Sequence, residues 1–171
     1  LVVYLGYDFT DWIKLSTEVE MEHAYVTDGA GGEISIEQLY VDFLFADAAN
    51  ARVGRVLAPL GFINQSHEPT LFFGVERPGV DEYNITTTWS LDGAGIFGSP
   101  LGWLSYQAYA VAGLEGSGFD GSNGVRKGSN KERSGLNDPA VTGRLDFFPF
   151  VDADLPADQD LRIGVSGYYG G

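Results

Sequence analysis

Apolar and polar residues alternate along much of the chain, most clearly over residues 12–26. There Ile13 and Leu15 share one set of alternate positions, while Lys14 and Glu18 belong to the other. Successive side chains of a β-strand point to opposite faces, so this pattern predicts a strand with one apolar and one charged face. No stretch of the chain shows the periodicity of an amphipathic helix.

Turn-forming residues divide the chain into eight segments of this kind and no predicted helix. The predicted strands cover residues 2–8, 12–26, 34–45, 52–63, 85–97, 104–114, 140–150 and 161–169. Most of them reach the roughly 9 to 11 residues that a tilted strand needs to cross a membrane.

The predicted connections alternate in length. Short or fairly short ones cover residues 9–11, 47–50, 98–102 and 152–160, and longer ones cover 27–33, 64–84 and 115–139. In an antiparallel up-and-down sheet every second connection lies at the same end, so one end has short turns and the other has long loops. Outer-membrane barrels have this asymmetry. We therefore predict an all-β fold, an antiparallel up-and-down transmembrane β-barrel, with residues 1–171 forming a single barrel segment.

The second and third predicted strands suggest a register. If residues 27–33 close a hairpin with Ala24 opposite Ile36, Glu18 faces Asp42 and the apolar faces of the two strands stay together. Like charges directly opposite each other destabilise a strand pair, so this register would require a cation or an arginine nearby.

In a barrel with lipid outside, the charged positions face a water-filled lumen. The predicted pore-lining residues are Lys14, Glu18, Glu20, Glu22, Asp42, Arg52, Arg144, Asp146 and Arg162. The facing of Arg52 stays open at this point, because the step from Gly54 to Arg55 breaks the alternation and is compatible with a β-bulge. The acidic second and third strands and the arginines would form opposite walls of the pore.

One predicted loop carries a basic cluster in an otherwise acidic chain, and we consider it a candidate constriction or anion-recruiting loop. The cluster consists of Arg126, Lys127, Lys131 and Arg133. The ordinary alternative is an exposed hydrophilic loop without such a role.

Composition and charge exclude several other classes. The chain has no cysteine, which excludes a disulfide framework and cysteine-ligated zinc, and no run of 18 apolar residues that would form a transmembrane helix. A formal net charge of −14 argues against nucleic-acid binding. The two histidines, His23 and His67, lack a neighbouring metal-ligand spacing or nucleophile motif, so we expect no enzyme, no cofactor and no metal.

Several ordered motifs resemble the porin O and P family, the phosphate-selective porins of Gram-negative bacteria. They are Arg52-Val53-Gly54, Pro59-Leu60-Gly61, Asn64, His67-Glu68-Pro69, Gly74-Val75, Arg77-Pro78, Thr87-Thr88-Trp89, Thr142-Gly143-Arg144-Leu145-Asp146 and Gly164-Val165-Ser166-Gly167-Tyr168-Tyr169. The resemblance implies a trimeric barrel of about sixteen strands, of which this chain would supply about half. The acidic segment departs from the basic pore of that family, so phosphate selectivity is not carried over.

The sequence thus predicts a bacterial outer-membrane porin, a channel for passive diffusion of ions and small hydrophilic solutes. Its expected partners are outer-membrane lipid, the solutes and two further copies in a homotrimer. Two alternatives stay open: a soluble β-sandwich or barrel that acts as a binding module, and an outer-membrane scaffold that does not conduct.

Overall fold

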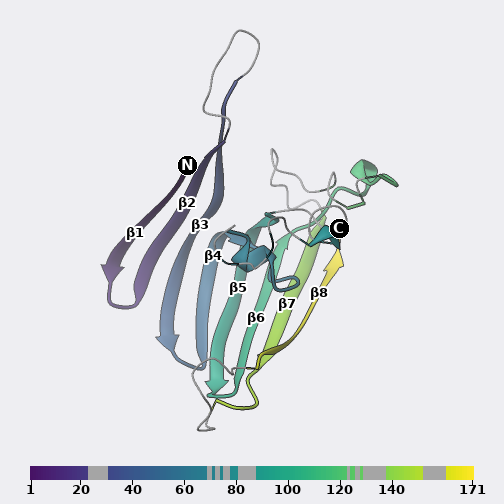
Figure 1. Cartoon of the computed structure of the whole chain (residues 1–171). Helices are drawn as coiled ribbons and strands as arrows, with labels where there is room; N and C mark the ends of the chain where they lie inside the picture. The colour runs from purple at the N-terminus through teal and green to yellow at the C-terminus, as the bar shows by residue number, and fades with distance from the viewer. Residues whose placement is uncertain are drawn as a thin grey trace.

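A computed structural model describes residues 1–22, 31–68, 71, 74, 78–80, 88–122, 124–125, 128, 138–151 and 161–171. The described residues form one curved antiparallel sheet in which each strand pairs with its neighbours in the sequence (Figure 1). The strands are β1 (Val2–Thr10), β2 (Ile13–Glu22), β3 (Glu33–Ala46), β4 (Ala49–Leu57), β5 (Ser90–Leu101), β6 (Leu104–Ala112), β7 (Pro139–Phe147) and β8 (Ile163–Gly170). Two short 3₁₀ helices, η1 (Asn64–Ser66) and η3 (Gly116–Gly118), lie outside the sheet. The predicted all-β, eight-stranded, up-and-down sheet is confirmed.

Tight turns connect alternate strand pairs at one end of the sheet. The pairs Thr10↔Ile13, Ala46↔Ala49 and Leu101↔Leu104 each leave only two residues in the turn. These turns lie together at the lower end of the sheet in Figure 1, opposite the ends from which the connections after β2, β4 and β6 leave. The predicted short turns are therefore present as the first, third and fifth connections, but the seventh, also predicted to be fairly short, covers residues 148–162 and is longer than the connection between β2 and β3.

The register of β2 and β3 differs from the predicted one. Glu18 lies opposite Gln38, and Asp42 lies opposite Lys14, a residue of opposite charge. The predicted pairing of Glu18 with Asp42 is wrong because β3 is displaced along β2: Glu22, the last described residue of β2, pairs with Glu33 and not with Gln38 as predicted.

The same pair of strands contains a β-bulge. Glu18 pairs with Gln38 but the next residue, Val19, pairs with Ile36, so Glu37 is an additional residue in β3. Both Ile36 and Leu39 lie on the apolar face, in register with Val19 and Thr17. Glu37 and Gln38 consequently both belong to the polar face, a placement that simple alternation could not predict.

Gly54 does not interrupt the ladder, since β4 stays in regular register with both β3 and β5 there. Arg52 therefore lies on the same face as Asp42, whereas Arg55 lies on the opposite face and is paired with Asp92 at 2.8 Å. Gly54 has φ of 135°, and a Cβ at this position would lie 2.2 Å from the backbone oxygen of Leu39. Only glycine fits here.

The two faces of the sheet differ sharply. On one face, apolar side chains from every strand are in register across the sheet and many of them are exposed. Large examples are Val3, Leu5, Ile36, Leu39, Val53, Ile96, Val141, Leu145 and Val165. We call this the outer face, and the opposite, concave face the inner face. None of the helices in the described residues is long and apolar enough to cross a membrane.

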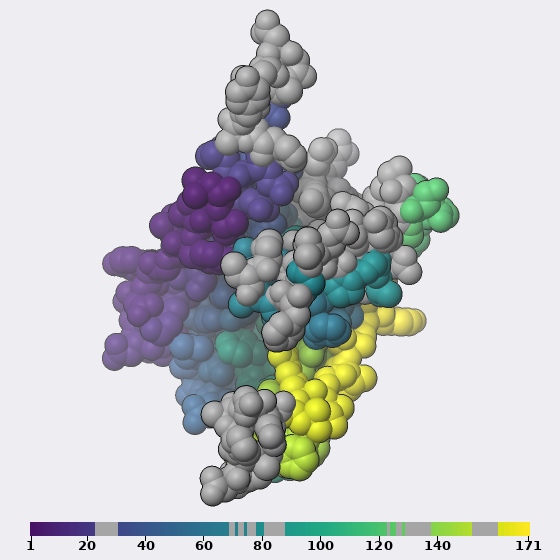
Figure 2. All heavy atoms as spheres, viewed as in Figure 1, coloured from purple at the N-terminus to yellow at the C-terminus, as the bar shows by residue number. Residues whose placement is uncertain are grey.

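Residues 58–68, which we call the inserted segment, leave the end of β4 and lie over the inner face. In the space-filling view this part of the chain lies between the purple N-terminal strands and the yellow β8 (Figure 2). The predicted strand over residues 52–63 is therefore too long, since β4 ends at Leu57. Pro59 has no N–H for the ladder, and Gly61 at φ of 61° turns the chain inward.

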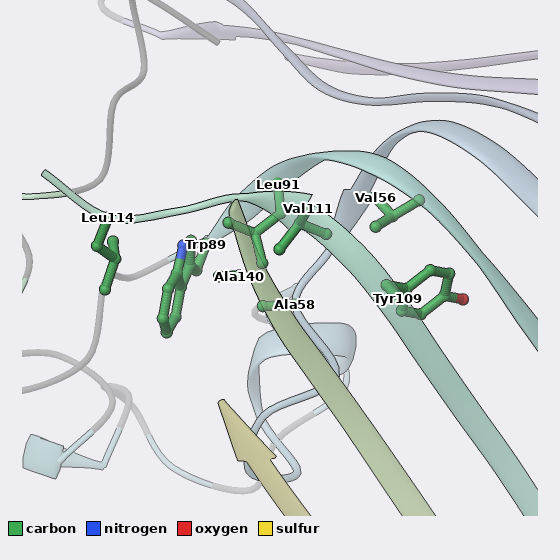
Figure 3. Packing of buried hydrophobic residues seen from close by; sticks show 8 residues of the cluster. All are labelled: Val56, Ala58, Trp89, Leu91, Tyr109, Val111, Leu114 and Ala140. Carbon is green, nitrogen blue, oxygen red and sulfur yellow. The ribbon is translucent and has the colours of Figure 1, made fainter. Parts of the chain in front are cut away.

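Beneath this region lies a small apolar core (Figure 3). Its members are Val56, Ala58, Trp89, Leu91, Tyr109, Val111, Leu114 and Ala140, each no more than 6% exposed. They come from the inner faces of β4 to β7 and from the chain that flanks these strands. The ring of Trp89 also packs against Tyr168 of β8, with centroids 5.2 Å apart. The core thereby attaches the inserted segment to the sheet.

Candidate functional site

The inner face, together with the inserted segment, brings most of the polar side chains of the sheet into contact. The segment reaches several strands at once: Gly61 N–H donates to Ser166 Oγ of β8 at 3.1 Å, and the Gln65 amide bonds the Gln107 amide of β6 at 2.8 Å. His67 of the same segment lies 3.0 Å from Glu37 of β3, which is five strands from β8 in the sheet, so the segment spans the concavity. We take this face as the candidate functional site.

Asn64 holds the inserted segment in place and is only 4% exposed. Its Nδ2 donates to the carbonyls of Ala58, at 2.8 Å, and Trp89, at 3.1 Å. Its Oδ1 accepts from the Trp89 backbone N–H at 2.8 Å. The Asn64 side chain therefore completes the backbone hydrogen bonding just after β4 and just before β5. Buried backbone N–H and C=O groups need such partners.

Three charged side chains form a second feature, which we call the Asp146 cluster. Asp146 accepts from Arg144 Nε at 2.7 Å and from Arg162 Nε at 2.8 Å. Arg144 also donates through Nη1 to the carbonyl of Gly61 in the inserted segment. Arg144 and Asp146 are buried, whereas the Arg162 side chain is 49% exposed. A cavity of about 750 Å³ lies against both arginines and Phe62.

A third feature is the pair of Arg52 and Asp42, joined by bonds of 2.6 and 2.8 Å. The Arg52 guanidinium also lies 3.8 Å from the centroid of the Tyr40 ring and 4.8 Å from that of Phe97. Such a bidentate, ring-packed arginine is held in one orientation. Together with the Asp146 cluster, it shows arginines alternating with carboxylates on the inner face rather than forming a separate positive wall.

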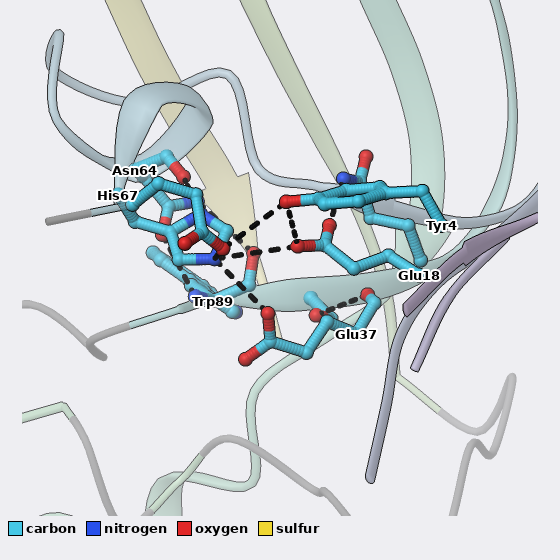
Figure 4. A network of polar contacts seen from close by, with 9 residues as sticks. Tyr4, Glu18, Glu37, Asn64, His67 and Trp89 are labelled. Atoms are coloured by element: carbon cyan, nitrogen blue, oxygen red, sulfur yellow. Dashed lines mark hydrogen bonds and ion pairs between the residues drawn. The ribbon is translucent and has the colours of Figure 1, made fainter. Parts of the chain in front are cut away.

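The fourth feature is a buried group that we call the His67 cluster: Glu18, Glu37, His67 and Glu68 (Figure 4). His67 Nε2 lies 3.0 Å from Glu37 Oε2, 3.7 Å from Glu68 Oε1 and 4.0 Å from Glu18 Oε1. Glu18, Glu37 and His67 are 1%, 8% and 5% exposed, and Glu68 is partly exposed.

Neutral donors surround this cluster. Tyr4 Oη donates to Glu18 Oε1 at 2.7 Å and lies 3.1 Å from Glu68 Oε1, and the Gln38 amide donates to the other Glu18 oxygen at 2.5 Å. Burial by itself would lower the pKa of His67, but the hydrogen bond to Glu37 and the negative charges of Glu37 and Glu18 outweigh it and raise that pKa. The cluster therefore favours a positive charge at its centre.

The predicted pore-lining residues all lie on the inner face or at its edge, but their exposure varies. Lys14 pairs with Asp8 at 2.7 Å, Glu22 is exposed, and Glu20 is partly exposed. Glu18, which we expected in open water, is covered by the inserted segment instead. The loop residues Arg126, Lys127, Lys131 and Arg133 lie outside the described residues, as does His23.

Sequence reasoning missed the His67 cluster because its members come from distant parts of the chain. Glu37 occupies a position that alternation assigns to the apolar face, and only the bulge brings it inside. His67 and Glu68 belonged to a predicted loop with no spacing typical of metal ligands. The one local signal was a histidine followed by a glutamate, which is too common to identify a site.

Comparison with known proteins adds one relative. No family model matches the sequence. The chain is 37% identical over 175 residues to an uncharacterised protein of Aquifex aeolicus (strain VF5). The alignment includes all of this chain but 38% of the relative, so the chain spans well under half of that protein's length.

Proposed function

We propose that this chain is part of the wall of an outer-membrane porin, a channel for passive diffusion of ions and small hydrophilic solutes. The observation that carries the proposal is the outer face, where exposed apolar side chains lie in register on all eight strands. Soluble monomers rarely expose contiguous apolar patches larger than a few hundred Å². Lipid is the partner that would cover such a face on every strand at once.

The proposal requires this sheet to be part of a closed barrel. In the described structure β1 and β8 each pair with one neighbour only. Within a bilayer, unpaired backbone N–H and C=O groups cost several kcal/mol each, so a sheet that inserts there must close. Because the relative from Aquifex aeolicus is much longer than this chain, further strands from a longer protein are the proposed means of closure. The number expected from the porin resemblance, about sixteen, agrees with the size range of such barrels.

The inner face would then line the lumen. Charged residues on it are paired or partly exposed, as they would be next to water, and Arg162 projects beside the cavity that also contacts Phe62. The inserted segment would narrow the pore from within. The predicted lining residues that are not buried, and so retain exposure for contact with permeating ions, are Lys14, Glu20, Glu22, Asp42, Arg52 and Arg162.

The decisive experiment uses the full-length protein that contains this chain, reconstituted in a planar bilayer. Stepwise conductance is expected, and the reversal potential under a KCl gradient gives the ion preference. A matched pair of variants tests the orientation: Leu39→Lys on the outer face should reduce insertion by about 2 to 4 kcal/mol, whereas Ser16→Lys on the inner face should insert normally. Equal insertion of both variants would contradict the proposed lipid face.

A non-conducting outer-membrane scaffold is a second candidate, favoured by one observation. The inserted segment crosses the inner face and covers Glu18, Arg144 and Asp146, each no more than 6% exposed. If it fills the lumen of the complete barrel, a folded and inserted protein would be electrically silent. A protein that stays in solution without detergent would overturn both candidates and favour a soluble binding module.

A further inference from the structure

We propose that Glu18, Glu37, His67 and Glu68 bind a divalent transition-metal ion that clamps the inserted segment to β2 and β3. This metal site is independent of whether the barrel conducts, because it depends only on the inner face as it is folded. It departs from the expectation from the sequence that the protein binds no metal.

The four ligand atoms lie close enough together to surround one metal ion. One atom from each residue can be chosen so that all four lie within 4.8 Å of one another. Ligands of a tetrahedral Zn²⁺ ion lie about 3.3 to 3.6 Å apart, given metal–ligand distances near 2.0 to 2.2 Å. The separations from His67 Nε2, at 3.0, 3.7 and 4.0 Å, lie on both sides of that value. Side-chain shifts of a few tenths of an ångström would bring them to it.

The orientation of His67 is an independent indication. Its Nδ1 lies 3.1 Å from the backbone carbonyl of Asn64. A carbonyl oxygen only accepts, so Nδ1 carries the hydrogen and Nε2 points at the three carboxylates. Histidine ligands of metals are typically held in this way, with the second ring nitrogen donating to a carbonyl or carboxylate. The imidazole is itself 95% buried, being 5% exposed.

Charge gives a third reason. Even a protonated His67 supplies one positive charge against the three carboxylates that surround it. Buried carboxylates are costly unless they are paired or coordinate a metal. Tyr4 and Gln38 donate hydrogen bonds to Glu18 but bring no charge. A divalent cation would offset the excess negative charge of the three carboxylates, and the neutral donors Tyr4 and Gln38 would orient the Glu18 ligand.

The donor set suggests which ion. Imidazole nitrogen suits zinc and other first-row transition metals, and carboxylate oxygens are hard donors, so one nitrogen with three oxygens fits Zn²⁺ or Mn²⁺ better than a thiolate-binding or an all-oxygen metal. We choose Zn²⁺ as the probe because it binds more tightly than Mn²⁺ in the usual order of affinities.

The site would connect three parts of the chain. Glu18 belongs to β2, Glu37 is the bulged residue of β3, and the remaining two ligands follow η1 in the inserted segment. An ion bound to all of them would tie this segment to the sheet at the end opposite to the Asp146 cluster, which holds it through Gly61.

The test is calorimetric titration of Zn²⁺ into the full-length, detergent-solubilised protein after dialysis against a chelator. We expect one ion per chain and at least tenfold weaker binding for His67→Gln, which retains an amide that can donate to Glu37. Gln65→Ala, in the 3₁₀ helix η1 that precedes His67 and outside the cluster, is the matched control and should bind as the parent does. Circular dichroism checks that each variant is folded.

Two results would overturn the proposal: a folded parent that binds no Zn²⁺ in stoichiometric amount, or equal binding by folded His67→Gln. Either would mean that a proton on His67 is the only cation in the cluster. If His67→Gln does not fold, Glu68→Gln at the partly exposed ligand provides the same comparison. Zn²⁺ binding is measured independently of conductance. A protein that binds one Zn²⁺ ion but does not conduct would therefore refute the proposed porin function and support the metal site.

Discussion

Replacing Asn64 with alanine should lower the free energy of unfolding by about 2 to 4 kcal/mol. The side chain makes three hydrogen bonds, of 2.8, 3.1 and 2.8 Å, and the two that it donates to carbonyls contribute about 0.5 kcal/mol each. The two carbonyls that it binds keep another partner each, because Leu60 N–H donates to Ala58 and Ala58 N–H donates to Trp89. The buried N–H of Trp89 loses the Asn64 acceptor, which costs a further 1 to 3 kcal/mol or so.

The assay is urea denaturation of the full-length protein in detergent micelles, followed by tryptophan fluorescence. Gln65→Ala is the control, because its bonds to Gln107, at 2.8 and 3.3 Å, are only part-buried and water can replace them. Hydrogen exchange over residues 58–68 should accelerate in Asn64→Ala and much less in the control. If Asn64→Ala lowers the free energy of unfolding by less than about 0.5 kcal/mol, or by no more than Gln65→Ala does, Asn64 does not hold the inserted segment on the sheet.

Three further predictions concern the sheet and the proposed lumen. Gly93→Val should abolish most folding, since a Cβ there would lie 2.2 Å from a backbone oxygen of β6, while Gly102→Ala, with nothing within 4 Å, should fold normally on gels that separate folded from unfolded protein. Val111→Ala should lower the free energy of unfolding in urea by about 2 kcal/mol, because two buried methyl groups are lost; no change would contradict its 1% exposure. Arg162→Gln should shift the reversal potential toward cation preference, because a 49% exposed positive charge disappears, and an unchanged potential would remove this residue from the conducting path.

The strands could be predicted from the sequence because alternation is a local property. Each of the eight was located, but the pairing of Arg52 with Asp42 was not predicted, because the facing of Arg52 stayed open and the arginines were expected on the wall opposite the acidic strands. The register of β2 and β3 could not be predicted, because it depends on where the hairpin stops pairing and on one additional residue at Glu37. The additional residue does leave a trace, since the apolar residues of β3 change from even positions up to Ile36 to odd positions from Leu39 onward, but the register with β2 leaves none.

The inserted segment illustrates a different limit. Ala58, Leu60 and Phe62 continue an alternating pattern, so the sequence extends β4 through them. The chain leaves the sheet instead, because Asn64 and the apolar core make contacts from the inner face that no local pattern encodes. Tertiary contacts of this kind also assemble the His67 cluster, whose members are neighbours only after the segment has folded over the sheet.

The bulge in β3 has a consequence for how such a wall can change over evolutionary time. A substitution that adds a carboxylate to the interior must replace a residue that already points there. Insertion of Glu37 adds a carboxylate without replacing any residue. The facing of the other side chains of β3 is unchanged, since Ile36 and Leu39 on either side of the bulge both stay on the outer face. Deleting Glu37 should therefore yield a regular hairpin with an unchanged outer surface. Insertion or deletion of a single codon can thus add or remove a carboxylate on the inner face without changing the apolar outer face.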